Sequence, residues 1–489
     1  MLQSGTIKTP YEAMPARDQP LERSIVEGDA IVRSSLSVVD IVLLLILWGV
    51  VFASSIVPLG LLGQVTFLAT STVLTIRKPS NGLLILLLIF YTPAVTVGIP
   101  NIFTVVAALT LASTILLTPA SIGRLLIKPG PVLLAASVFV LYGAVQTILS
   151  DNMTLALPYY KKYLEGIGLL TILFLTVQSR NDLGRVLIWW AVVAGLTTIV
   201  KVAHIYFGDN TVLYRTMEAM FLNDEFGLEH RIHIRHGGET GRRFLLPGEE
   251  PNYTSASLVF PLALALAFYS AGKAIAKLFW AGIACMTAIA CVGTYSRSGF
   301  LATALVGGLY VLRGNAVKAI IPIGSMAAAF AVAVVSIPSL HKRIFGIGGA
   351  VNEGATGRFD LWRQAIDMWF DSPIFGNGMS AFYDRYHGAA HNTYLQVLAE
   401  TGLLGFALYC TVIAVAIRIG RRLQKSEVFS STAVDIQLSK SALSGLLGFC
   451  FMIATVTYQD VKLFWLALGV YAAMYLLHRS PSPMNVKEY

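Results

Sequence analysis

Charged side chains are scarce in this chain of 489 residues: Asp, Glu, Lys and Arg together make up 13% of it. A soluble globular protein carries roughly 25% charged residues, so the composition argues against a soluble protein. Hydrophobic residues account for 55% of the sequence, and its mean hydropathy is +0.68. This balance predicts a polytopic membrane protein.

Cysteine is also rare, and all four cysteines fall inside apolar stretches: Cys285, Cys291, Cys410 and Cys450. Their spacing is neither CxxC nor that of a metal-ligand set, so we expect small core residues and no disulfide framework. The sequence also holds no carboxylate cluster of the kind that binds Mg²⁺ or Ca²⁺. We therefore expect no metal and no cofactor.

The N-terminus lacks the pattern of a cleaved signal peptide, since no apolar run follows its first residues. Residues 1–37 are polar and mixed in charge, which predicts a disordered cytoplasmic tail. The net charge of +9 is modest for this length and gives no reason to expect a nucleic-acid partner.

What the sequence has in abundance is apolar segments, and each is near the length that crosses a bilayer as a helix. They predict an all-α fold of about 12–14 transmembrane helices. The segments lie near 38–59, 60–76, 81–98, 101–119, 130–149, 163–179, 185–206, 252–272, 277–295, 298–313, 318–337, 391–417, 441–459 and 461–477.

Lys and Arg in the short loops gather on one side of this arrangement, and the positive-inside rule makes that side cytoplasmic, with both termini there. Two longer stretches then fall on the periplasmic side. The expected organisation is the tail (1–37), N-terminal transmembrane helices (38–206), a first periplasmic loop (207–251), transmembrane helices (252–337), a large periplasmic loop (338–390), C-terminal transmembrane helices (391–478) and a cytoplasmic tail (479–489).

Both long loops are rich in basic residues, which indicates an anionic partner. In the first, Arg242 and Arg243 precede "PGEEPNYT", where Pro251 suits the start of a helix. Helix capping explains most of that string, but it explains neither arginine nor Asn252 just inside the membrane edge. We take these three residues as candidate substrate contacts.

The short turn "GTYSRSGF" places Arg297 between two closely spaced membrane helices on the same side. Arginine could snorkel to lipid headgroups there. Its hydroxyl-bearing neighbours Tyr295, Ser296 and Ser298 favour a second interpretation, a guanidinium that holds a phosphate through two hydrogen bonds.

In the second loop, apolar residues recur at helical spacing between Arg358 and Trp369, which predicts an amphipathic helix at the membrane surface. "DSPIFGNG" then interrupts it. We expect most residues of this stretch to have a structural role, and we single out Arg358 and Arg385 as candidate substrate contacts.

The stretch "HGAAHNTYLQVLAETGLLG" passes from a polar loop into an apolar helix at His391 and Asn392. Gly402 would lie about 16 Å deeper in the membrane and, with Gly405, permit close helix contact. The positive end of the helix disfavours an imidazolium, so His391 is a candidate general base. Glu400 has no evident role.

At these residues the chain resembles the O-antigen ligase and polymerase superfamily of bacterial envelope glycosyltransferases, which have a GT-C-like helical fold. The pattern is His391 and Asn392, nine residues, then Gly402-x-x-Gly405, supported by "TYSRSG" and the "FGNG" approach. The recognisable region covers about residues 240 to 410.

The resemblance implies metal-independent, inverting transfer of a glycan from undecaprenyl diphosphate to an acceptor hydroxyl. The reaction would take place on the periplasmic face of the bacterial inner membrane. It also implies that His391 is the catalytic base and that Arg297, with Arg242 or Arg243, stabilises the leaving diphosphate. Asn392 would orient the hydroxyl or the substrate.

The acceptor stays open between the lipid A core of a ligase, a second lipid-linked glycan of an O-antigen or exopolysaccharide polymerase, and a protein. The spacing slightly favours a ligase. A transporter for lipid-linked sugars is the alternative of another class, but transporters place unusual residues near the bilayer midplane and show related halves. An envelope sensor or scaffold would also fit the composition.

Overall fold

The computed structural model describes residues 37–56, 60–92, 101–127, 129–207, 233–236, 239–242, 251–312, 324, 335, 356–425, 433–457 and 461–479. Several expected features lie outside these residues, and no structural statement is made of them. They are the tail up to residue 36, Arg243 with most of the first loop, nearly all of the segment 318–337, residues 338–355 and residues 480–489.

The expected apolar segments that lie within the described residues become helices, since a backbone in lipid has to satisfy its own hydrogen bonds. The first half of the chain forms α2 (Val38–Ile56), α3 (Gly60–Arg77), α4 (Pro79–Tyr91), α5 (Ile102–Leu117), α6 (Pro119–Ile127), α7 (Pro131–Ile148), α8 (Met153–Thr176) and α9 (Arg180–Phe207). The second half forms α12 (Pro251–Ala271), α13 (Ala274–Gly293), α14 (Arg297–Tyr310), α17 (Thr356–Asp371), α18 (Ala381–Tyr386), α19 (Thr393–Gln424), α20 (Ala433–Ile453) and α21 (Lys462–Arg479).

Within the described residues, four helices are long and apolar enough to cross a membrane: α7, α12, α13 and α19. Shorter apolar helices accompany them, such as those over 102–117 and 462–478. The predicted helical, polytopic membrane fold is therefore confirmed. The only strands in the described part of the chain, β1 (His233–His236) and β2 (Glu239–Arg242), form an antiparallel hairpin that was not expected from the sequence.

Helix α12 lies at the centre of the bundle and is buried along nearly its whole length. It packs against α20 through glycines: a Cβ on Gly445 would meet Phe260, and one on Gly448 would meet Val259 of α12 and Val306 of α14. The contact moves toward the start of α12 as α20 advances, so the two helices run antiparallel. The start of α12 and the end of α20 thus share one end of the bundle.

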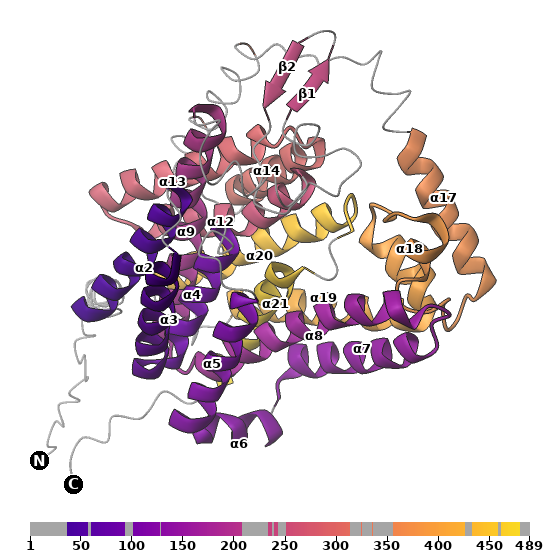
Figure 1. The fold of residues 1–489 in the computed structure, drawn as a ribbon, viewed down its shortest axis with the longest axis horizontal. Coiled ribbons are helices and arrows are strands. Elements are labelled where there is room, and N and C mark those ends of the chain that lie inside the picture. Colours follow the sequence, from indigo (N-terminus) through magenta and orange to yellow (C-terminus); the bar gives the residue numbers. More distant parts are fainter. Residues whose placement is uncertain are drawn as a thin grey trace, which may run out of the picture.

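Helices α17 and α18 gather at one side of the bundle, beside the ends of α7, α8 and α19 (Figure 1). They are fastened to the turn between α7 and α8: Ser150 Oγ donates to the carbonyl of Met379 at 3.1 Å, and Asn152 Nδ2 to the carboxylate of Asp384 at 2.8 Å. We call the end of the bundle that carries this turn the His391 end. The opposite end, which carries the last turn of α19, is the Arg418 end.

Candidate functional site

His391 stands at a sharp turn directly before α19. Its φ is 49°, in the left-handed region that non-glycine residues seldom adopt. The following residue, Asn392, caps the helix, because its carboxamide oxygen accepts a hydrogen bond from the backbone N–H of Leu395 at 3.2 Å. The cap fixes the direction in which the chain enters the helix and holds the half-buried imidazole at the helix N-terminus.

Left-handed backbone is concentrated around the sequence-predicted site. Five described residues other than glycine have a positive φ: Asn101, Tyr295, Ser380, His387 and His391. Apart from Asn101, each lies in the turn before Arg297 or in the segment leading to α19. Such conformations cost on the order of 1–3 kcal/mol each and persist only where the surroundings hold them. Their clustering indicates that these two segments are held in a shape that the local sequence alone would not adopt.

A buried glutamine holds the residue before His391 in place. Gln396 Oε1 accepts hydrogen bonds from the backbone N–H of Ala390 at 3.1 Å and from Thr457 Oγ1 at 3.0 Å. Its Nε2 donates to Glu400 Oε1 at 3.0 Å, one turn further along α19. Gln396 and Glu400 are 1% and 2% exposed, so these hydrogen bonds are shielded from water. Glu400, which had no evident role in the sequence, is therefore a hydrogen-bond partner of Gln396, the residue that positions the loop before α19.

The residue on the other side of the cap is anchored as well. Thr393 donates twice to the carbonyl of Val456, from its backbone N–H at 3.2 Å and from Oγ1 at 2.8 Å. Val456 lies three residues after the end of α20. His391 is thus held between Gln396 on one side and the segment that follows α20 on the other.

Gly402 interrupts α19 rather than serving close helix contact as the sequence predicted. Its φ of 65° and ψ of −172° are not helical. The backbone N–H groups of Leu403 and Leu404, which the break would leave without partners, donate to the carbonyls of Pro373 and Ile374 at 2.9 and 3.1 Å. The partner at Gly402 is therefore the loop before α18, and not another helix.

The "FGNG" loop fits the break closely. A Cβ on Gly376 would lie 2.4 Å from the carbonyl oxygen of Glu400, and one on Gly402 would lie 2.4 Å from that of Ile374. Asn377 Nδ2 donates to the carbonyls of Met368 and Ala399 at 2.7 and 2.9 Å. The spacing of the glycines reflects this loop-to-helix joint, which carries α17 and α18 against α19.

Gly405, the last glycine of the motif, does meet a second helix. A Cβ there would lie 2.8 Å from the ring of Tyr142 on α7 and 2.2 Å from the hydroxyl of Thr401. The Tyr142 hydroxyl donates to the carbonyls of Phe375 and Thr401 at 2.9 and 3.1 Å. The predicted close helix contact is confirmed at this position.

Arg297 is the first residue of α14, and its side chain is exposed. Ser296 caps that helix and also donates from Oγ to the carboxamide oxygen of Asn252 at 2.7 Å. A second bond joins the same elements, between Ser255 Oγ and Thr294 Oγ1 at 2.7 Å. Asn252 therefore contacts the turn that presents Arg297.

His391 and Arg297 lie at the same end of the bundle. Arg297 is joined to the start of α12 through Ser296 and Asn252. The start of α12 shares an end with the end of α20, and Val456 there binds the residue two places after His391. The two clusters that were predicted to share one face of the membrane therefore lie at the same end of the bundle.

The structure gives fewer contacts for the arginines of the two long loops. Arg385 on α18 pairs through Nη1 with Asp371 Oδ2 at 2.5 Å, and this hydrogen bond raises the pKa of the guanidinium above its usual value. Arg358 lies in the first turn of α17 and is half-buried. Arg242 ends β2, and Arg243 lies outside the described residues.

Sequence reasoning missed Gln396, Asn377 and Asn152, which position the loops. Each is a polar side chain in or beside an apolar run, and that is the signal that could have identified them. Among the described residues, no three His, Cys, Asp or Glu side chains gather in the manner of metal ligands.

Comparison with known proteins identifies one region of the chain. Residues 281–410 match the family model described as O-antigen ligase. The match runs from α13 to the middle of α19 and so includes Arg297, the "FGNG" loop, His391 and Gly405. No curated protein matches the chain.

Proposed function

We propose a specific reaction for this protein, because residues 281–410 match the family model described as O-antigen ligase, which favours a ligase-like or polymerase-like glycosyltransferase. It transfers a glycan from undecaprenyl diphosphate to an acceptor hydroxyl. The protein is embedded in a membrane through its apolar helices. We place it in the bacterial inner membrane, with the His391 end facing the periplasm and both termini in the cytoplasm.

In this proposal Arg297 binds the diphosphate of the donor. An exposed guanidinium at the start of a helix combines its own charge with the positive end of the helix dipole. Its planar fork of N–H donors fits two phosphate oxygens at once. Negative charge grows on the diphosphate as the bond to the sugar breaks, so a fixed cation there stabilises the transition state more than the ground state.

His391 acts as the general base. The acceptor oxygen attacks the anomeric carbon of the donor glycan and gives its proton to the imidazole. The carbon–oxygen bond to the diphosphate breaks at the same time, and the electron pair leaves with undecaprenyl diphosphate. Attack opposite to the leaving group inverts the anomeric configuration, and the imidazolium then releases its proton to water.

The remaining candidates would contact the substrates. Asn392 uses its carboxamide oxygen as the helix cap, so its NH₂ group is the part that would meet a sugar or the acceptor. Asn252 would act through the Ser296 turn. We assign the arginines of the two long loops to the diphosphate or to anionic groups of the glycan: Arg242, Arg243, Arg358 and Arg385.

The observation that carries the proposal is the joint placement of His391 and Arg297 at one end of the bundle, each beside left-handed backbone. The diphosphate of a lipid-linked donor and the water-exposed hydroxyl of an acceptor can meet only at such a boundary. A ligase that uses lipid A core as the acceptor is our first assignment. A polymerase of lipid-linked repeat units shares the same donor chemistry and is the second.

A deletion strain tests the proposal through the glycans of its envelope. A ligase predicts lipid A core without attached glycan, together with long lipid-linked chains that are retained. A polymerase predicts single repeat units. An unchanged glycan profile in the deletion would contradict both functions.

A further inference from the structure

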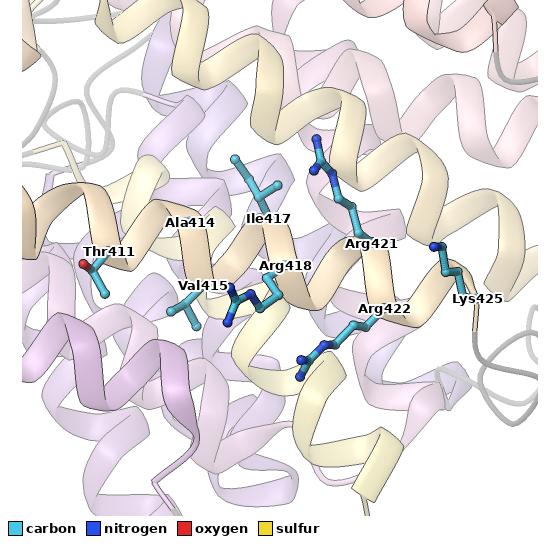
Figure 2. A pocket seen from close by; sticks show the side chains of 8 residues that line it. All are labelled: Thr411, Ala414, Val415, Ile417, Arg418, Arg421, Arg422 and Lys425. Carbon is cyan, nitrogen blue, oxygen red and sulfur yellow. The ribbon is translucent and has the colours of Figure 1, made fainter.

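The last turns of α19 form a groove at the Arg418 end that the proposed reaction does not use (Figure 2). Its cavity volume is about 550 Å³. Within the described part of the chain, the side chains that line it come from α19 and its C-cap, Lys425: Thr411, Ala414, Val415, Ile417, Arg418, Arg421, Arg422 and Lys425.

Four cations occupy one face of the helix here. Arg418, Arg421, Arg422 and Lys425 follow one another at intervals of three and one residues, which keeps them on neighbouring positions of the helix surface. All four side chains are exposed, and none forms an ion pair with a carboxylate among the residues that the structure describes. Cations three and four residues apart repel one another. An anion bound between them would relieve this repulsion.

The negative end of the helix dipole explains part of this charge. It favours cations in the last turn of the helix, and the effect fades within that turn. Arg418 lies two turns before the end of α19, beyond most of this effect. The helix dipole therefore explains the cations in the last turn of α19, but it does not explain Arg418.

The groove changes from charged to apolar along the helix axis. Thr411, Ala414 and Val415 precede the cations on the same face, and Thr411 lies about 10 Å from Arg418 along the axis. Figure 2 shows Thr411 and Val415 along the same stretch of helix as the three arginines. A ligand that matches both parts has an anionic head and an apolar tail.

We propose that this groove binds an anionic phospholipid of the adjoining leaflet. The phosphate lies among Arg418, Arg421 and Arg422, where guanidinium groups form paired hydrogen bonds with its oxygens. An acyl chain runs over Val415 toward Thr411. Arg418 lies 16 residues beyond the break at Gly402, about 24 Å further along the helix at 1.5 Å per residue, so this site is separate from the proposed donor site at the His391 end.

The test is lipid binding to the intact, detergent-purified protein, measured by native mass spectrometry during titration with phosphatidylglycerol. The double variant Arg418→Gln/Arg422→Gln should bind this lipid about 10- to 30-fold more weakly than wild type, since each basic residue near an anionic headgroup contributes a factor of about five. Both side chains are exposed, so the variant should fold. The matched control is Lys273→Gln/Lys277→Gln, which removes the same charge from the start of α13 at the same end of the bundle.

Four outcomes decide the proposal. Loss of phosphatidylglycerol in the arginine variant alone, with weak phosphatidylcholine binding to wild type, supports it. An equal loss in the lysine control indicates general charge attraction and overturns it. Unchanged binding in both variants also overturns it. Displacement of the lipid by millimolar inorganic phosphate would identify a site for free phosphate instead.

Discussion

The side-chain oxygen of Gln396 accepts a hydrogen bond from the backbone N–H of Ala390, and so ties the first turn of α19 to the residue directly before His391. The same oxygen receives the Thr457 hydroxyl, and the side chain continues to Glu400. Through Ala390, Gln396 can in this way decide where the imidazole stands. The proposed chemistry depends on that position as well as on the histidine itself.

Replacing Gln396 with leucine should therefore slow glycan transfer by about 10- to 100-fold, since a misplacement of about 1 Å can cost a factor of 100. Leucine keeps much of the volume but offers nothing to the Ala390 N–H. The measurement is the initial rate of transfer by purified protein. Gln424→Leu, on the same helix at the Arg418 end, is the matched control and should keep the wild-type rate. Equal rates in the two variants would contradict the positioning role.

Replacing Gly402 with alanine should destabilise the protein by about 1–3 kcal/mol, because the position has a positive φ and a Cβ there would strike the Ile374 carbonyl. The melting temperature in detergent measures this. Gly282→Ala in α13 is the control, since no atom lies within 4 Å of the added Cβ, and it should raise stability by about 0.5–1 kcal/mol. A Gly402→Ala variant that melts no earlier than wild type would argue against the break in α19.

The sequence was sufficient to predict where the helices lie, because an apolar run long enough to cross a bilayer leaves the backbone few alternatives. It was less successful where polar residues extend a helix. The apolar segment was expected to begin at 163, but α8 begins at Met153, since Asn152 caps it and its charged middle is helical as well.

The site also divides into residues that the sequence could predict and contacts that it could not. The motif pointed to His391, Asn392, Gly402 and Arg297, but the reason for Gly402 lies in a joint with a loop more than twenty residues away. No local pattern encodes such a contact. The link between Asn252 and Ser296 joins positions 44 residues apart and is invisible to periodicity for the same reason.

Arg297→Lys should lower the transfer rate by about 10- to 100-fold although the charge is kept, because an ammonium cannot form the paired hydrogen bonds of a guanidinium. Since its side chain is exposed, the melting temperature should stay near that of wild type. The rate with a lipid diphosphate donor provides the measurement. A lysine variant as fast as wild type would show that Arg297 contributes only its charge or nothing.

Arg385→Gln should raise the KM for the lipid-linked donor several-fold, if the arginine leaves Asp371 to bind an anionic substrate. The exposed ion pair contributes about 0–1 kcal/mol, so exchanging one partner for another costs little. Asp371→Asn removes the ion pair without removing the cation and is the matched control. A similar rise in KM in both variants would assign Arg385 to structure alone.

The most direct test of the whole account is the rate of glycan transfer by purified His391→Gln compared with His387→Gln. Both histidines have left-handed backbone and lie four residues apart, but only His391 precedes the cap of α19. General-base catalysis contributes typically 10²- to 10⁴-fold. The account predicts a loss of about that size for His391→Gln and a rate within about twofold of wild type for His387→Gln. A wild-type rate in His391→Gln, with the protein folded and membrane-inserted, would contradict it.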